Sequence, residues 1–214
     1  MSIHLFKHNQ QAYRAVTAML EKEKMAAVIH PTGTGKSLIA FKLAEENPSK
    51  HFLWLSPSEY IYQTQLEKLN MKFPNIQFMS YSRLMKNEDS IETLHPDYII
   101  LDEFHRCGAQ EWGKSVRKLL DTYPNAKRLG LSATNIRYLD NQRNMAEEIF
   151  DGKIASEMTL GEAIVREILP EPKYVIAMYS YQKELEQLKK RIRTLSNQGL
   201  ITENQKLLEQ LRRA

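Results

Sequence analysis

The segment Pro31-Thr32-Gly33-Thr34-Gly35-Lys36-Ser37 is the most informative part of this sequence. It follows a short apolar run, Ala26–His30, and opens a segment with helical periodicity, Lys36–Glu45. Glycines between a strand and a helix let successive backbone N–H groups point into one concavity, and the helix N-terminus adds a partial positive charge. This layout predicts a loop that binds the phosphates of a nucleotide. A glycine-rich turn without a ligand is the alternative that the residues leave open.

The side chains of this loop have expected roles. Lys36 would reach the β- and γ-phosphates, and the hydroxyl of Ser37 would ligate Mg²⁺. The nucleotide-binding set also contains Thr32, Gly33, Thr34 and Gly35. The strict form of the pattern has Gly or Ala five residues before its second glycine, a position that His30 occupies here. We therefore expect His30 to mark the end of the strand and to press on the loop or on the nucleotide.

A second segment carries two adjacent acids. The apolar run Tyr98–Leu101 is continuous, as expected for a strand covered on both faces, and Asp102 and Glu103 follow it. Asp102 can hold Mg²⁺, usually through water, and Glu103 can accept a proton from an attacking water. Because paired acids at a strand end are also common on protein surfaces, this interpretation depends on the phosphate loop lying close by.

Strand-like runs alternate with helical patterns along the chain. The expected helices are Asn9–Glu23, Lys36–Glu45, Glu59–Leu69, Ala109–Leu120, Met145–Phe150 and Leu160–Ile168. The expected strands are Ala26–His30, His51–Leu55, Gln77–Ser80, Tyr98–Leu101, Leu129–Ser132 and Tyr174–Met178. This alternation predicts an α/β fold with a mostly parallel sheet and helices on both faces. In such sheets the ligand lies at the carboxyl ends of the strands, where the loop and the acids fall.

The pattern changes after Tyr179. Apolar residues then follow at helical spacing: Tyr181, Leu185, Leu188, Ile192 and Leu195. Asn197-Gln198-Gly199 breaks this helix, and Thr202 with Gln205 has the spacing of a capping box that opens another. We therefore expect a main domain over 1–179 and a C-terminal helical hairpin or interdomain segment over 180–214.

The composition is that of a soluble globular protein, with 42% apolar and 26% charged residues. No secretory signal or long apolar segment is evident, and a single cysteine fits a reducing cytosol. We expect a cytoplasmic protein with no membrane contact. Residues 180–214 contain 8 basic and 4 acidic residues and carry the whole net charge of +4. This basic segment could contact phosphates, although a solvated helix face is the simpler interpretation.

Three further side chains are expected to pack in the interior. Cys107 follows the acidic pair closely and is expected to be a buried small residue rather than a reactive thiol. Trp54 and Trp112 fall in strand and helix patterns, where packing is their expected role.

Five motifs together resemble those of superfamily-2 helicases. Asp102-Glu103-Phe104-His105 resembles their acidic box in its DExH form, and Ser132-Ala133-Thr134 resembles their third motif. Ser56-Pro57-Ser58 resembles motif Ia, and Ser80-Tyr81-Ser82-Arg83-Leu84 resembles a segment on the nucleic-acid face of related DNA motors. Leu5-Phe6-Lys7-His8-Asn9-Gln10-Gln11-Ala12 resembles the adenine-recognising Q-motif region. The order and spacing match across residues 5–179. The chain is therefore similar to the N-terminal RecA-like ATP-binding domain of DEAD/DEAH-box helicases.

The resemblance implies a RecA-like P-loop NTPase that binds ATP and Mg²⁺. His105, with Ser132 and Thr134, would link the nucleotide state to nucleic-acid binding, although the two hydroxyls could simply close a turn. The contacts implied for the sugar-phosphate backbone come from Pro57, Ser58, Tyr81 and Arg83, of which Tyr81 could equally be a core aromatic. Asn9 aligns with the Q-motif glutamine and Gln10 is adjacent to it, a departure that bears on adenine selectivity.

A complete motor of this type has a second RecA-like domain that supplies arginine fingers in a Gln-x-x-Gly-Arg-x-x-Arg-like motif. No such motif occurs in the 214 residues. We therefore expect the first motor domain of a longer helicase or translocase, binding DNA rather than RNA and hydrolysing ATP slowly by itself. Two alternatives stay open: the motor of a restriction or repair complex that translocates without separating strands, and a non-catalytic ATP-binding module whose acid pair is only structural.

Overall fold

The computed structural model describes residues 2–137, 142–173, 182–194 and 205–206. The chain divides into two compact units, Met1–Glu171 and Pro172–Ala214. The first unit contains the sheet, and the second contains helix α8, Gln182–Thr194. The expected boundary between residues 179 and 180 lies outside the described residues, so the division into 1–179 and 180–214 stays a prediction.

Six parallel strands form the sheet of the first unit, in the order β3-β2-β4-β5-β1-β8. The strands are β1 Met25–Ile29, β2 Phe52–Ser56, β3 Ile76–Ser80, β4 Tyr98–Asp102, β5 Lys127–Ser132 and β8 Ile154–Glu157. Alternate side chains point to opposite faces. In β4, Ile99 and Leu101 belong to one hydrophobic cluster, while Tyr98 and Ile100 belong to the other. Burial on both faces explains why the central strands read as continuous apolar runs.

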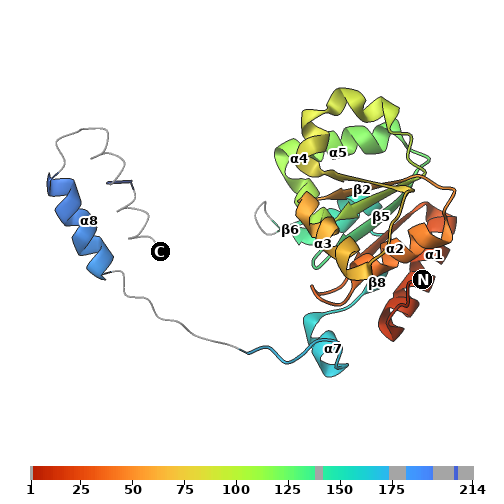
Figure 1. Cartoon of the computed structure of the whole chain (residues 1–214), viewed down its shortest axis with the longest axis horizontal. Helices are drawn as coiled ribbons and strands as arrows, with labels where there is room; N and C mark the ends of the chain where they lie inside the picture. Colours follow the sequence, from red (N-terminus) through yellow and green to blue (C-terminus); the bar gives the residue numbers. More distant parts are fainter. Residues whose placement is uncertain (1, 138–141, 174–181, 195–204, 207–214) are drawn as a thin grey trace. The chain divides into compact units, whose positions relative to one another are not determined.

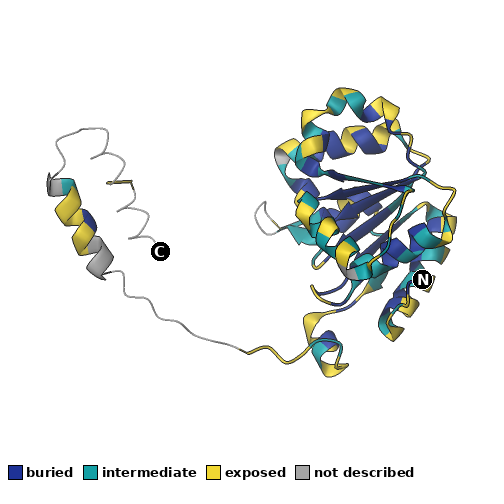
Figure 2. Ribbon diagram, in the orientation of Figure 1, coloured by how far each residue is buried: buried dark blue, intermediate teal, exposed yellow. Residues whose placement is uncertain are grey.

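Helices cover both faces of this sheet (Figure 1). One face carries α1 Lys7–Glu23, α2 Lys36–Glu46 and α3 Glu59–Leu69. The other carries α4 Tyr81–Lys86, α5 Gln110–Thr122, α6 Met145–Phe150 and the 3-10 helices η1 Glu88–Thr93 and η2 Phe104–Gly108. Figure 2 shows the strands buried between these two layers. The predicted α/β fold with a parallel sheet and helices on both faces is confirmed.

Several elements of the structure were not predicted. The sixth strand is β8, which lies at the sheet edge beside β1 and is only partly buried. Helix α4 was also not predicted. The same holds for a short antiparallel pair of strands after β5, formed by β6 (Ile136–Arg137) and β7 (Arg143–Asn144). Helix α7 (Leu160–Val165) is shorter than expected, and Glu167, just beyond it, has a positive φ of 54°.

The C-terminal predictions are only partly covered. Helix α8 coincides with the first helix expected after Tyr179. The expected strand Tyr174–Met178 lies outside the described residues, as does most of the second helix, of which residues 205–206 are helical. Within the described part of the chain, none of the helices combines the length and apolar character needed to cross a membrane.

Candidate functional site

The glycine-rich loop lies between β1 and α2, as the sequence predicts. Gly33 and Gly35 have φ angles of 91° and 81°, in the left-handed region that favours glycine. A Cβ atom added at Gly35 would lie 2.8 Å from Nδ2 of Asn9, so the loop approaches helix α1 too closely for any other residue. Thr34 is buried, and its hydroxyl donates to the carbonyl oxygen of Pro31 at 2.8 Å, which closes the turn.

The loop and the acid pair line the same cavity of about 480 Å³. The lining residues from these two segments are Thr32, Gly33, Gly35, Lys36, Ser37, Asp102 and Glu103. Strands β1 and β4 flank β5, and because all three run parallel their carboxyl ends meet at one edge of the sheet. A cavity of this size suits a small-molecule ligand, for which volumes of about 300–1,000 Å³ are usual.

Lys36 is held against the loop. Its side chain is buried, and its ammonium group donates to the carbonyl oxygens of His30 at 2.8 Å and Pro31 at 3.2 Å. Burial lowers the pKa of Lys36, and the charges of Glu103 and Asp102 oppose that shift. An anionic ligand in the cavity would stabilise this buried ammonium group more strongly than two neutral carbonyls do.

The two acids lie in different environments. Asp102 is 6% exposed, and burial, reinforced by the charge of Glu103, raises the pKa of Asp102 to about 7. Glu103 is partly exposed and adopts a φ of 53°, a left-handed conformation that costs a residue with a Cβ about 1–2 kcal/mol. A strained backbone at the mouth of a cavity is a frequent mark of a functional position.

The cavity suits a hard divalent cation. A buried carboxyl group whose ionised form is disfavoured would gain from a cation beside it, and the hydroxyl of Ser37 is a second oxygen donor in the same cavity. Among the described residues, no cluster of three or more His, Cys, Asp or Glu side chains could hold a metal by itself. Mg²⁺ fits such a site because it binds through one or two protein oxygens together with substrate phosphates and water.

His105 connects the acid pair to the segment after β5. Its Nδ1 lies 2.8 Å from Oγ of Ser132 and 3.3 Å from Oε2 of Glu103. The Ser132 hydroxyl donates its only proton to the carbonyl oxygen of Thr134 at 2.6 Å, so Nδ1 of His105 must be the donor to Ser132. Burial lowers the pKa of His105 and favours its neutral form. Ser132 and Thr134 therefore close a turn, and Ser132 also contacts the acidic segment through His105.

His30 directly follows strand β1, where the strict loop pattern has a small residue. It is 1% exposed, and burial, with the charge of Lys36, lowers its pKa to about 4. Its Nε2 lies 2.8 Å from Oγ of Ser156 on β8, and its backbone N–H donates to the carbonyl oxygen of Ser132. His30 is not among the residues that line the cavity, so it supports the loop from the side of β8.

The N-terminal helix contacts the loop through residues of the expected Q-motif region. Asn9 is fully buried, and its Nδ2 donates to the carbonyl oxygens of Thr34 at 3.0 Å and Gly35 at 3.2 Å. His8, which the sequence did not single out, places Nε2 2.8 Å from the same Thr34 oxygen. Gln10 is exposed and donates to the backbone of Leu5, away from the loop. Neither Asn9 nor Gln10 lines the cavity formed by the glycine-rich loop and the acid pair.

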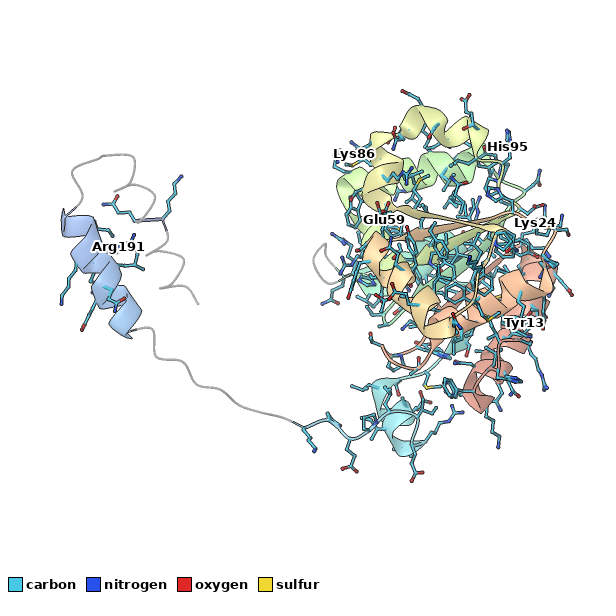
Figure 3. All side chains as sticks on the ribbon, in the orientation of Figure 1. Tyr13, Lys24, Glu59, Lys86, His95 and Arg191 are labelled. Atoms are coloured by element: carbon cyan, nitrogen blue, oxygen red, sulfur yellow. The ribbon has the colours of Figure 1, made fainter. Side chains whose placement is uncertain are left out.

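The residues expected to contact nucleic acid lie at the ends of two neighbouring strands. Ser56 of β2 and Ser80 of β3 are register partners, so the segments that follow them start side by side. Pro57 is partly buried, and the hydroxyl of Ser58 accepts from the N–H of Tyr60 at the start of α3. Arg83 is exposed and lies 3.7 Å from Glu59. Glu59, which is labelled in Figure 3, is the residue that begins α3.

Tyr81 requires a correction, because it lies in the core rather than on this surface. It is 1% exposed, its hydroxyl donates to the backbone carbonyl of Asp102 at 2.8 Å, and its ring stacks on Trp112. Because its side chain is buried in the core cluster, its ring is not available to a nucleic-acid backbone. Cys107 and Trp54 are buried as expected, and burial raises the pKa of Cys107 to about 12.

The pKa of Asp102 gives a test of the site in the absence of ligand. The folded chain binds this proton more tightly than the unfolded chain, so the free energy of unfolding falls as the pH rises from about 4 to about 7. Asp102→Asn should therefore stabilise the metal-free and nucleotide-free chain at pH 8, by up to about 4 kcal/mol at about 1.4 kcal/mol per pKa unit. The gain should be smaller at pH 5.

Urea denaturation at pH 5 and pH 8 in a chelating buffer measures this difference. Asp97→Asn is a control of opposite sign, because the His51 N–H and Lys50 lower the pKa of Asp97. That variant should lose stability at pH 8. Equal stabilities of Asp102→Asn and the parent chain at pH 8 would contradict the environment described for Asp102.

The sequence matches one known protein family. Residues 2–75 and 67–137 match the family described as the type III restriction enzyme, res subunit. These ranges cover more than half of the chain. No curated protein matches the sequence.

Solved structures with the same fold include a restriction-modification enzyme and a helicase domain. The ATP-dependent Type ISP restriction-modification enzyme LlaBIII bound to DNA is 20% identical with a TM-score of 0.58, covering 80% of this chain and 16% of that chain. The Hef helicase domain of Pyrococcus furiosus is 16% identical with a TM-score of 0.55, covering 88% of this chain and 48% of that chain. The chain thus spans less than half of the length of either protein.

Proposed function

The chain belongs to the family described as the type III restriction enzyme res subunit, and from this premise we propose that it is the first motor domain of an ATP-dependent nucleic-acid helicase or translocase. It is a RecA-like domain of the superfamily-2 DExH type. The observation that carries the proposal is the single cavity lined by the glycine-rich loop and by the acid pair.

Within that cavity each residue has a proposed task. The backbone N–H groups of the loop and the ammonium group of Lys36 bind the phosphates of ATP. Ser37 and Asp102 hold Mg²⁺, which when bound neutralises charge on the phosphates. Glu103 accepts the proton of the attacking water, and its unusual backbone conformation directs it to the cavity. Asn9 positions the loop through its two carbonyl contacts and does not read the base directly.

Nucleic acid is the proposed second substrate. Ser58 and Arg83 lie at the ends of adjacent strands, where an exposed guanidinium and helix-capping hydroxyls can meet a phosphate backbone. The contacts among Glu103, His105, Ser132 and Thr134 are the proposed link between that backbone and the ATP site. DNA is favoured because LlaBIII was solved bound to DNA.

The family match also bears on the kind of motor. Its description supports a restriction-type translocase, whereas the likeness to the Hef helicase domain concerns the fold. A second RecA-like domain with arginine fingers belongs to the proposed complete protein. A single buried cysteine is compatible with a cytoplasmic location, which stays a prediction.

Calorimetric titration of the 214-residue chain with ATP tests the nucleotide part. We expect binding that requires Mg²⁺ and is lost when the metal is chelated. A labelled DNA strand tests the nucleic-acid part by fluorescence anisotropy, and its affinity should fall steeply with salt. A folded chain that binds neither ATP at millimolar concentration nor DNA at low salt is incompatible with a motor domain.

A further inference from the structure

A second cavity lies beside the ATP site on the α5 side of the sheet. It has a volume of about 470 Å³ and is lined by η2, the start of α5 and the segment after β5. Glu103 lines the first cavity, His105 lines the second, and their side chains are 3.3 Å apart. The two cavities therefore meet at one carboxylate–imidazole contact. We call the second one the Trp112 cleft.

The described lining of the Trp112 cleft is basic. Among the described residues that line it, Arg106 and Arg137 carry charge and none is a carboxylate. Burial lowers the pKa of His105; the charge of Glu103 opposes that shift, and the charges of Arg106 and Arg137 add to it. A Cβ atom at Gly108 would come within 2.6 Å of Cδ of Arg137, so the absent side chain of Gly108 leaves the space in which Arg137 lies over η2.

The cleft also contains one large aromatic side chain. Trp112 lines it and is only partly buried, and its indole stacks on Tyr81 with ring centroids 5.6 Å apart. Tyr81 is fixed in turn by its hydrogen bond to the backbone of Asp102. The indole is therefore held rigidly, which lowers the entropy lost when a flat ligand stacks on it.

A basic groove with an aromatic platform is the combination by which proteins bind single-stranded nucleic acid. We propose that the Trp112 cleft binds one nucleotide of a single strand, with its base on Trp112 and its phosphate between Arg106 and Arg137. This inference rests on the proposed function and adds to it a specific subsite. A nucleotide in the cleft would lie against His105 and Thr134, which are both hydrogen-bonded to Ser132, and His105 lies 3.3 Å from Glu103.

The chain contains two tryptophans, which makes the cleft easy to observe. Trp54 is 0% exposed in β2, so a change in tryptophan emission on adding an oligonucleotide reports on Trp112. The probe is a labelled single-stranded oligothymidylate at low salt, followed by anisotropy for binding and by tryptophan emission for stacking. We expect quenching that saturates together with the anisotropy.

Variants then assign the contacts. Trp112→Ala should weaken oligothymidylate binding about 5- to 150-fold, and Trp112→Phe, which keeps a stacking ring, should weaken it less and abolish the emission change. Arg106→Ala should weaken binding and reduce the slope of log K against log salt by about 1. Lys22→Ala removes an exposed charge from α1 and should leave binding unchanged.

The outcomes separate this inference from the proposed function. Oligothymidylate binding with unchanged emission, and with unchanged affinity in Trp112→Ala and Arg106→Ala, overturns the cleft and leaves the proposed motor domain standing. Quenching by an acidic protein segment and not by the oligonucleotide overturns it in favour of a protein contact. No binding by a folded chain that still binds ATP overturns both the cleft and the nucleic-acid part of the proposed function. Thermal unfolding of each variant shows whether a loss is one of folding.

Discussion

Lys36→Ala is expected to lower the affinity of the chain for Mg-ATP by about 10- to 150-fold. Charge-assisted hydrogen bonds are worth about 1.5–3 kcal/mol each, which corresponds to that range. Two carbonyls already accept from Lys36, and both are neutral. Exchanging them for phosphate oxygens is therefore favourable, and the ammonium group needs only a short movement within the cavity that it lines. Calorimetric titration of parent and variant measures the difference.

The control for this variant is Lys50→Ala. Lys50 pairs with Asp97 at the other end of the sheet strands and does not line the cavity. Lys50→Ala should therefore leave the affinity of the chain for Mg-ATP unchanged. Lys36→Met keeps the length of the buried side chain and separates loss of charge from loss of packing. If Lys36→Met binds Mg-ATP as tightly as the parent chain, Lys36 does not contact the phosphates.

The glycine-rich loop and the acid pair could be predicted because each is a short continuous stretch of sequence. Two glycines with positive φ angles and the lysine that follows them lie within a few residues of one another. The two acids lie at the end of a continuous apolar strand. The carboxyl-end rule of parallel sheets then brings Lys36 and Asp102 together. The fold followed from the same alternation of strands and helices.

The contacts that support this site could not be read from the sequence, because they join distant residues. Ser156 lies 126 positions after His30, and the carbonyl of Thr34 lies 25 positions after Asn9. Strand β8 had no apolar run because it is a partly exposed edge strand. Tyr81 was ambiguous for a related reason: a polar aromatic at the start of a helix fits a surface or a core, and only the packing of α4 against α5 places it inside.

The carboxylate of Glu103 is the proposed general base of the site. Glu103→Gln is expected to slow ATP hydrolysis by about 10²–10⁴-fold, because an amide cannot accept the proton that a general base removes. ATP affinity should change little. Nδ1 of His105 donates to Ser132, and this contact should survive because it does not depend on the charge of Glu103. Removing the charge of Glu103 also removes one cause of the raised pKa of Asp102, so the carboxyl group of Asp102, the proposed metal ligand, should ionise more readily.

Single-turnover hydrolysis with the chain in excess over ATP measures this effect even where turnover is slow. Glu111→Gln removes an exposed carboxylate from α5 and should hydrolyse ATP at the parent rate. An unchanged rate in Glu103→Gln would favour the alternative in which the acid pair is structural. The role of Glu103 would then be limited to the turn after β4 and to its contact with His105. A lost rate with intact ATP binding separates catalysis from binding at one residue. That separation is what the proposed motor function requires, because the site must bind ATP before it hydrolyses it.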